Sequence, residues 1–566
     1  MSSICSSRFR IPYASRVFAL SLAALALSGP AAAQRDQGVV DALARLLAAA
    51  DTRVYDPALF RETLRHPDPF VRRQAALAAG RIGDALAVDP LVAALEDSAP
   101  AVQAAVAFAL GLLKPPRAVA SLLALARAAP ATRQGPPQTE AVTAIAKTGG
   151  DEAAAALQEL LKPDTGPAGA VQRSALLEAW RLGGRAPIAA LMMHARNTDL
   201  VARRSAIYAL ARLRTARGVT VLVEALMDPE ASTRAVALRG LSCVLTNSAQ
   251  IAPQDVVSRI RPLLRDGDWH VRVNALRALA TFRDSALAAL ALPLATDLVL
   301  NVAVQAETTL GVLGGSRAVA ALQTGFASPT FALRRQAAIA LAQADSAAGV
   351  ATATDLTHES DWRWRSVAAE ALGAARDRGR LEAQLADLDG RVVVQALQAL
   401  QRLVPDSDSS LSPRALLRHP DAAVRSVAAD VVARLPVLDD VDRLAEAYLR
   451  AAADTFNDAR LSAVAALAAI AATSANARAA VATRFVARVP RPDDYLVRRL
   501  AAAKLPEAAT RWGPMAPIVT GRSLDDYRAI ARRYLLPARR GTAAPRVTIE
   551  TDRVPSWWSC SRPMRR

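Results

Sequence analysis

Cysteine, lysine and aromatic residues are scarce in this sequence, and the scarcity of cysteine and that of aromatic residues each exclude a class of protein. Three cysteines in 566 residues cannot form a disulfide framework, and their spacing fits no zinc site. Lysine stands at only four positions, so nearly all of the 70 basic residues are arginine. Aromatic residues make up 4% of the chain, too few to stack on successive bases. Despite a formal net charge of +18, we expect no specific nucleic-acid binding.

Catalytic and cofactor-binding motifs are also missing from the sequence. It contains no H-E-x-x-H, paired C-x-x-C, G-x-S-x-G or phosphate-binding loop. The adjacent acids Asp525 and Asp526 are expected to be charges at a helix N-terminus rather than a catalytic pair. Cys243 lies in an apolar stretch and is expected to be a small core residue. We assign no catalytic, cofactor-binding or metal-binding residue.

Residues 1–33 have the composition of a secretory signal peptide. Three arginines precede the apolar stretch 17–27, which is too short to span a bilayer comfortably. Alanine fills positions 31–33 and provides an A-x-A cleavage site. We expect cleavage between Ala33 and Gln34 and a periplasmic or secreted protein with no stable membrane insertion afterwards. An uncleaved N-terminal membrane anchor is the alternative.

Residues 34–520 repeat themselves at intervals as short as 31 residues, which separate Arg203 from Arg234. Each unit contains a helix with apolar periodicity, a polar turn and a second helix. Small residues such as Ala75 and Ala337 allow neighbouring helices to approach closely, and stacked pairs share one core. The pattern predicts an all-α fold of roughly a dozen helical hairpins.

The recurring signature D-x-x-V-R-x-x-A resembles the HEAT repeat, including the short bacterial form also seen in phycobilisome lyases. The resemblance implies an α-solenoid that binds protein or peptide clients. In that family the recurring aspartates and arginines are usually structural and pair across adjacent repeats as a ladder. The residues expected in this ladder are Asp68, Arg72, Arg203, Arg234, Asp268, Arg272, Arg334, Arg365, Asp421 and Arg425.

After the array, residues 521–545 are expected to form a helix with Ser523 as its N-cap, followed by a linker rich in proline and arginine. Residues 546–553 then alternate apolar and polar side chains, as a half-buried strand does. The remaining residues lack that alternation. We therefore expect the strand to have no partner and the terminus beyond Leu536 to be sensitive to proteases.

The tail after Arg553 makes sense as a strand only in another reading frame. With G/C-rich codons and a shift of frame, it can encode A-V-V-V-E-L-F-P-T-D-A-P. Residues 546–566 then resemble the start of a bacterial cyclophilin-type peptidyl-prolyl isomerase, truncated or frameshifted after Arg553. An ordinary basic C-terminus is the alternative interpretation.

The two resemblances together imply an exported HEAT scaffold from a HEAT–cyclophilin fusion, with a short remnant of a β-domain at its C-terminus. A functional peptidyl-prolyl isomerase, if the frame is restored, and a lyase-like HEAT protein are the alternatives. No cofactor is implied. The client, the binding face and the oligomeric state are left open by the sequence.

Overall fold

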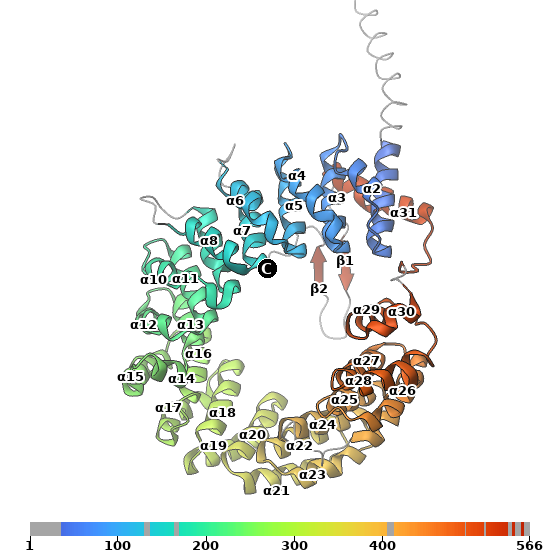
Figure 1. The fold of residues 1–566 in the computed structure, drawn as a ribbon. Coiled ribbons are helices and arrows are strands. Elements are labelled where there is room, and N and C mark those ends of the chain that lie inside the picture. Colours follow the sequence, from blue (N-terminus) through green and yellow to red (C-terminus); the bar gives the residue numbers. More distant parts are fainter. Residues whose placement is uncertain are drawn as a thin grey trace, which may run out of the picture. The chain divides into compact units, whose positions relative to one another are not determined.

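Pairs of helices stack on one another throughout the chain (Figure 1). Contacts divide the chain into two compact units, of which one comprises residues 1–187 with 517–566 and the other residues 188–516. The computed structural model describes residues 36–128, 136–162, 169–403, 413–492, 494–513, 517–541, 546–549 and 556–559.

In the first unit, each repeat joins a first helix to a second helix through a short polar turn. The turn before α3 shows how the sequence sets the boundary, because Asp68 accepts a hydrogen bond from the Phe70 amide and Pro69 begins the helix. Gly83 ends this helix with a φ of +83°, which glycine adopts without steric cost. After a helix over 36–52, the elements up to residue 187 are α2 (Pro57–Thr63), α3 (Pro69–Ile82), η1 (Ala85–Ala87), α4 (Val88–Ala93), η2 (Ala94–Glu96), α5 (Pro100–Leu113), η3 (Pro116–Ala118), α6 (Val119–Arg127), α7 (Pro136–Thr148), α8 (Gly150–Leu160), α9 (Ala170–Glu178) and η4 (Ala179–Arg185).

The second unit follows the same plan. Its first part contains α10 (Ile188–His194), α11 (Leu200–Leu213), η5 (Ala216–Gly218), α12 (Val219–Glu224), η6 (Ala225–Met227), α13 (Ala231–Gly240), α14 (Cys243–Ser248), α15 (Pro253–Leu263), α16 (Trp269–Ala280), η7 (Ser285–Leu287), α17 (Ala288–Ala291), η8 (Leu292–Thr296), α18 (Leu300–Leu313), α19 (Ser316–Phe326) and α20 (Phe331–Ala344). Its second part contains α21 (Ser346–Thr357), α22 (Trp362–Ala375), α23 (Arg378–Ala383), η9 (Gln384–Ala386), α24 (Gly390–Leu403), η10 (Pro413–Arg418), α25 (Ala422–Val432), η11 (Leu438–Asp440), α26 (Val441–Arg450), η12 (Ala451–Ala453), α27 (Asp458–Ala471), α28 (Ala475–Val481), η13 (Ala482–Val486), α29 (Tyr495–Lys504) and α30 (Pro506–Trp512).

Second helices of neighbouring repeats pack at contacts between small residues, as the sequence predicts. A Cβ atom placed on Gly80 of α3 would lie 2.7 Å from the Cβ of Ala109 on α5. The same close approach joins Gly311 of α18 to Ala340 of α20. Ala337, predicted to be buried from the repeat register, has no exposed surface. Such contacts leave no space for a larger side chain, so alanine and glycine are required there.

The C-terminal segment 517–541, which we call the C-terminal clasp, packs on the helix over residues 36–52. Its helix α31 (Leu524–Ile530) has the predicted N-cap, Ser523, in a capping box with Asp526. Tyr527 is buried and donates a hydrogen bond to Asp51 over 3.2 Å. Arg528 binds Asp41 at 2.7 Å. Figure 1 shows α31 beside the N-terminal helices.

The segment expected to be a linker is partly helical and is held by ion pairs. The helix passes through η14 (Ala531–Leu535) into α32 (Leu536–Arg539). Arg539 binds both Asp36 and Asp68, and Arg540 also contacts Asp36. These contacts lie beyond Leu536, where a protease-sensitive terminus was expected. Several carboxylates of the first two repeats therefore hold the clasp.

The strand at the C-terminus has a partner, which corrects the expectation of an unpaired edge. Strand β1 (Arg546–Ile549) pairs antiparallel with β2 (Ser556–Ser559), and Arg546 stands opposite Ser559. The sequence pattern missed β2 because it lacks apolar–polar alternation. It does contain Trp557 and Trp558, and tryptophan favours strands.

No helix in the described part of the chain combines the length and the apolar character needed to cross a membrane. The predicted signal peptide and its cleavage site, Ala33 and Gln34, lie outside the described residues.

Candidate functional site

Ladder arginines on the second helices bind aspartates in the turn of the next repeat. Arg72 Nε lies 2.6 Å from Asp97 Oδ2, and its Nη2 lies 2.9 Å from Oδ1. The same side chain donates through Nη1 to the carbonyls of His66 and Pro67 in its own turn. One guanidinium therefore ties two successive turns together. The other pairs of this kind are Arg203–Asp228, Arg234–Asp266, Arg272–Asp297, Arg365–Asp387 and Arg425–Asp454.

The acceptor Asp97 shows how this arrangement affects a carboxyl group. Burial by itself would raise the pKa of Asp97, but hydrogen bonds from Arg72 and from the Ala99 amide lower it below its usual value. The aspartates that receive the ladder arginines were not identified from the sequence. A spacing of 25 residues from the arginine, which three of these aspartates share, was a signal that could have found those three.

The three aspartates predicted for the ladder have other contacts. Asp68, Asp268 and Asp421 each cap the helix that follows by accepting from the backbone amide two residues later. The predicted ladder residue Arg334 does pair with the turn of the next repeat, where a glutamate, Glu359, lies 3.8 Å away, and its guanidinium also lies 4.3 Å from the ring centre of Trp364. The capping positions explain why these aspartates recur, since each repeat needs a helix start.

Cys243 is not a core residue, which corrects the sequence-based expectation. It begins the short helix α14, is partly exposed and lines a cavity of about 620 Å³ together with Arg261 and Phe282. Within the ranges that the structure describes, no cluster of three or more histidine, cysteine, aspartate or glutamate side chains is arranged to hold a metal ion.

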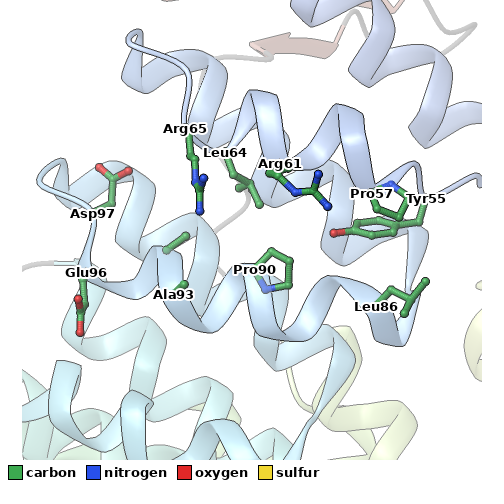
Figure 2. A pocket seen from close by; sticks show the side chains of 11 residues that line it. Tyr55, Pro57, Arg61, Leu64, Arg65, Leu86, Pro90, Ala93, Glu96 and Asp97 are labelled. Carbon is green, nitrogen blue, oxygen red and sulfur yellow. The ribbon is translucent and has the colours of Figure 1, made fainter.

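A groove of about 590 Å³ runs between α2 and α4, the first helices of two neighbouring repeats. Figure 2 shows Tyr55, Pro57 and Leu86 gathered at one end of it, and Glu96 with Asp97 at the other. The ring of Tyr55 is stacked on Phe60 with centres 4.6 Å apart, which fixes its orientation. The remaining lining residues are Arg61, Leu64, Arg65, Pro90, Ala93 and Ala94.

Two arginines lie over the middle of this groove. Figure 2 shows Arg61 extending from α2, and Arg65 from the turn after it, into the gap toward α4. Both are exposed, and among the described residues neither guanidinium has an ion-pair or hydrogen-bond partner. A concave surface with apolar walls and a few free polar groups is the usual form of a binding site. This groove is therefore the best candidate for a functional site within the described residues.

Comparisons with known proteins match parts of the array. The model for "HEAT repeats" matches residues 57–135 and 222–311, and the model for "PBS lyase HEAT-like repeat" matches residues 202–227. No curated protein matches the chain significantly.

Three solved structures illustrate the similarity. The complex of CpcE and CpcF of phycocyanin lyase from Nostoc sp. is 18% identical, with 43% of this chain and 94% of that chain covered and a TM-score of 0.32. A structure of Kap95p with RanGDP is 13% identical, with 86% and 75% covered and a TM-score of 0.41. The karyopherin Kap121p bound to the SUMO protease Ulp1p is 12% identical, with 84% and 64% covered and a TM-score of 0.42.

Proposed function

We propose that this all-α HEAT-repeat protein is an exported scaffold that binds extended segments of partner proteins. The observation that carries the proposal is the groove between α2 and α4, where apolar side chains lie beside two unpaired guanidinium groups. Apolar area supplies affinity, and free charges fix the orientation of a bound chain. Ala93, which lines the groove, is the natural position at which to block it.

Export and association with a prolyl isomerase are the finer parts of the proposal. Export is supported by the arginines, the apolar stretch 17–27 and the alanines at 31–33. The isomerase association is supported by the alternation over residues 546–553 and by the frame-shifted reading of the tail. In this proposal the array would hold a client while an isomerase domain acts on its prolyl bonds.

Binding can be tested with fluorescent peptides and the full chain. The peptides share their apolar residues and form three sets, which are acidic, neutral and basic. We expect at least one set to bind, and Ala93→Trp to weaken that binding by about tenfold or more because the indole would fill the groove. The measurement is fluorescence anisotropy. Ala189→Trp, on the exposed side of α10, is the matched control and should bind as the parent does. The proposal fails if no set binds.

Export has its own test. We expect protein recovered from outside the cytoplasm to begin at Gln34, because residues 31–33 offer the small side chains that signal peptidase requires. Intact mass and N-terminal sequencing provide the measurement. Recovery of material that still carries Met1 would contradict cleavage.

A further inference from the structure

Arg65 occupies a position that recurs in the repeats, three residues before the aspartate that caps the second helix. Arg196 and Arg418 stand at this position in two other repeats. Each of them binds a glutamate 28 residues later, on the first helix of the next repeat. Arg196 Nη2 lies 2.7 Å from Glu224 Oε2, and Arg418 Nη2 lies 2.7 Å from Glu446 Oε2. In these two repeats the arginine pairs with an acid across the gap between first helices.

In the repeat of Arg65 this glutamate is missing. The residue at the same offset is Ala93, the last residue of α4, and it lines the groove. Arg61 stands four residues earlier, on α2, and lines the same groove. The neighbouring acid Asp97 is already bound by Arg72. The groove therefore contains the guanidinium groups of Arg61 and Arg65, the carboxylate of Glu96 at one end, and the empty position of one further carboxylate.

The same replacement of the glutamate recurs in the second unit, where a cavity lies one helical turn away. Arg265 stands at the recurring position, and Pro293 replaces the glutamate 28 residues later. Arg261, one turn before Arg265, lines the cavity of about 620 Å³. Neither arginine has an ion-pair partner among the described residues. Arg265 and Pro293 themselves do not line that cavity, so the groove between α2 and α4 is the place where the unpaired arginine and the replaced glutamate line one cavity together.

We infer that the groove between α2 and α4 binds an acidic, extended segment of a partner protein, whose carboxylate takes the place of the missing glutamate. The inference rests on the proposed function and specifies the partner's chemistry. A guanidinium binds a carboxylate through two parallel hydrogen bonds. These bonds fix the orientation of the carboxylate in addition to the attraction between the two charges. Tyr55 and Leu86 offer apolar contact at the end of the groove remote from Glu96, so apolar residues of the segment lie there.

The test uses the full chain with a photo-crosslinking residue in place of Ala94, which reports on this groove alone. The probes are an acidic peptide and its isosteric copy with glutamine and asparagine in place of the acids. We expect the acidic peptide to crosslink and the neutral copy to crosslink about tenfold less. Ala93→Glu should abolish crosslinking, because the new carboxylate pairs with Arg65, and its melting temperature should not fall.

Matched variants separate this inference from the general proposal. Arg65→Ala should weaken crosslinking of the acidic peptide, whereas Arg196→Ala, which removes an arginine already bound to Glu224, should not. Equal crosslinking of both peptides, with no effect of Ala93→Glu, overturns the acidic specificity while leaving peptide binding intact. Displacement by an equal concentration of free glutamate would instead indicate a site for small anions. If none of the peptide sets binds, both the acidic specificity and the proposed function are overturned.

Discussion

Replacing Arg425 with alanine should lower the free energy of unfolding of its unit by about 3–5 kcal/mol. This guanidinium is 3% exposed, and its Nη2 lies 2.5 Å from both carboxylate oxygens of Asp454. Its Nη1 donates to the carbonyls of His419 and Pro420. The substitution would leave the charge of Asp454 and two turn carbonyls without their donor. Urea unfolding followed by circular dichroism measures the loss.

Arg418→Ala is the control for this experiment, because it removes an ion pair on the same repeat that is largely exposed. An exposed pair contributes about 0–1 kcal/mol. The Arg425 variant should also stay destabilised at high salt, since a buried pair is screened weakly. Equal losses for the two variants would show that the buried ladder contributes no more than a surface ion pair.

Glu307→Gln should remove a strong pH dependence from the stability of the second unit. Glu307 is 2% exposed on α18, and its Oε2 has no hydrogen-bond partner in the structure. Its carboxyl group fits beside Gly325, where a Cβ atom would clash with it. Burial raises its pKa from 4.5 to about 8, because an apolar surrounding disfavours the charged form.

The sign of the effect follows from this shift. Below pH 4.5 the carboxyl is protonated in both folded and unfolded chains, so its contribution to stability is fully present. Between pH 4.5 and 8 only the unfolded chain ionises, and stability falls by about 1.4 kcal/mol per pH unit. Above pH 8 the loss is complete. The glutamine variant cannot ionise and should therefore be more stable than the parent at pH 8.

Melting curves of parent and variant over this pH range provide the measurement. Glu359→Gln, at a partly exposed position near Arg334, is the matched control and should keep the slope of the parent. Parallel curves for the parent and Glu307→Gln would show that the carboxyl reaches solvent.

The pattern of apolar, small and helix-capping residues along the sequence was sufficient to predict the helix pairs and several of their details. The register that selected Ala337 as buried and the capping signal at Ser523 both hold in the structure. These features depend on residues close together in the sequence. The second strand, Ser556–Ser559, was missed because a four-residue segment without alternation carries no periodic signal.

The candidate groove needed information that a single repeat does not contain. Ala93 is an ordinary helix residue by itself, and it becomes informative only when Arg196 is seen to bind Glu224 at the same offset. Comparing registers across repeats could have revealed it, but only once the arginine–glutamate contact was known. Likewise, no local pattern states that Arg528 will bind Asp41, 487 residues away.

The C-terminal clasp has a consequence for the order in which the chain can fold during synthesis. Arg528, Arg539 and Arg540 pair with acids that lie 471 to 504 residues earlier in the chain. Ribosomes add about 5–20 residues per second, so roughly half a minute to a minute and a half separates the two partners. Throughout that interval the helix over residues 36–52 exists without the helix that covers it. The first repeat to be synthesised is thus among the last to be completed.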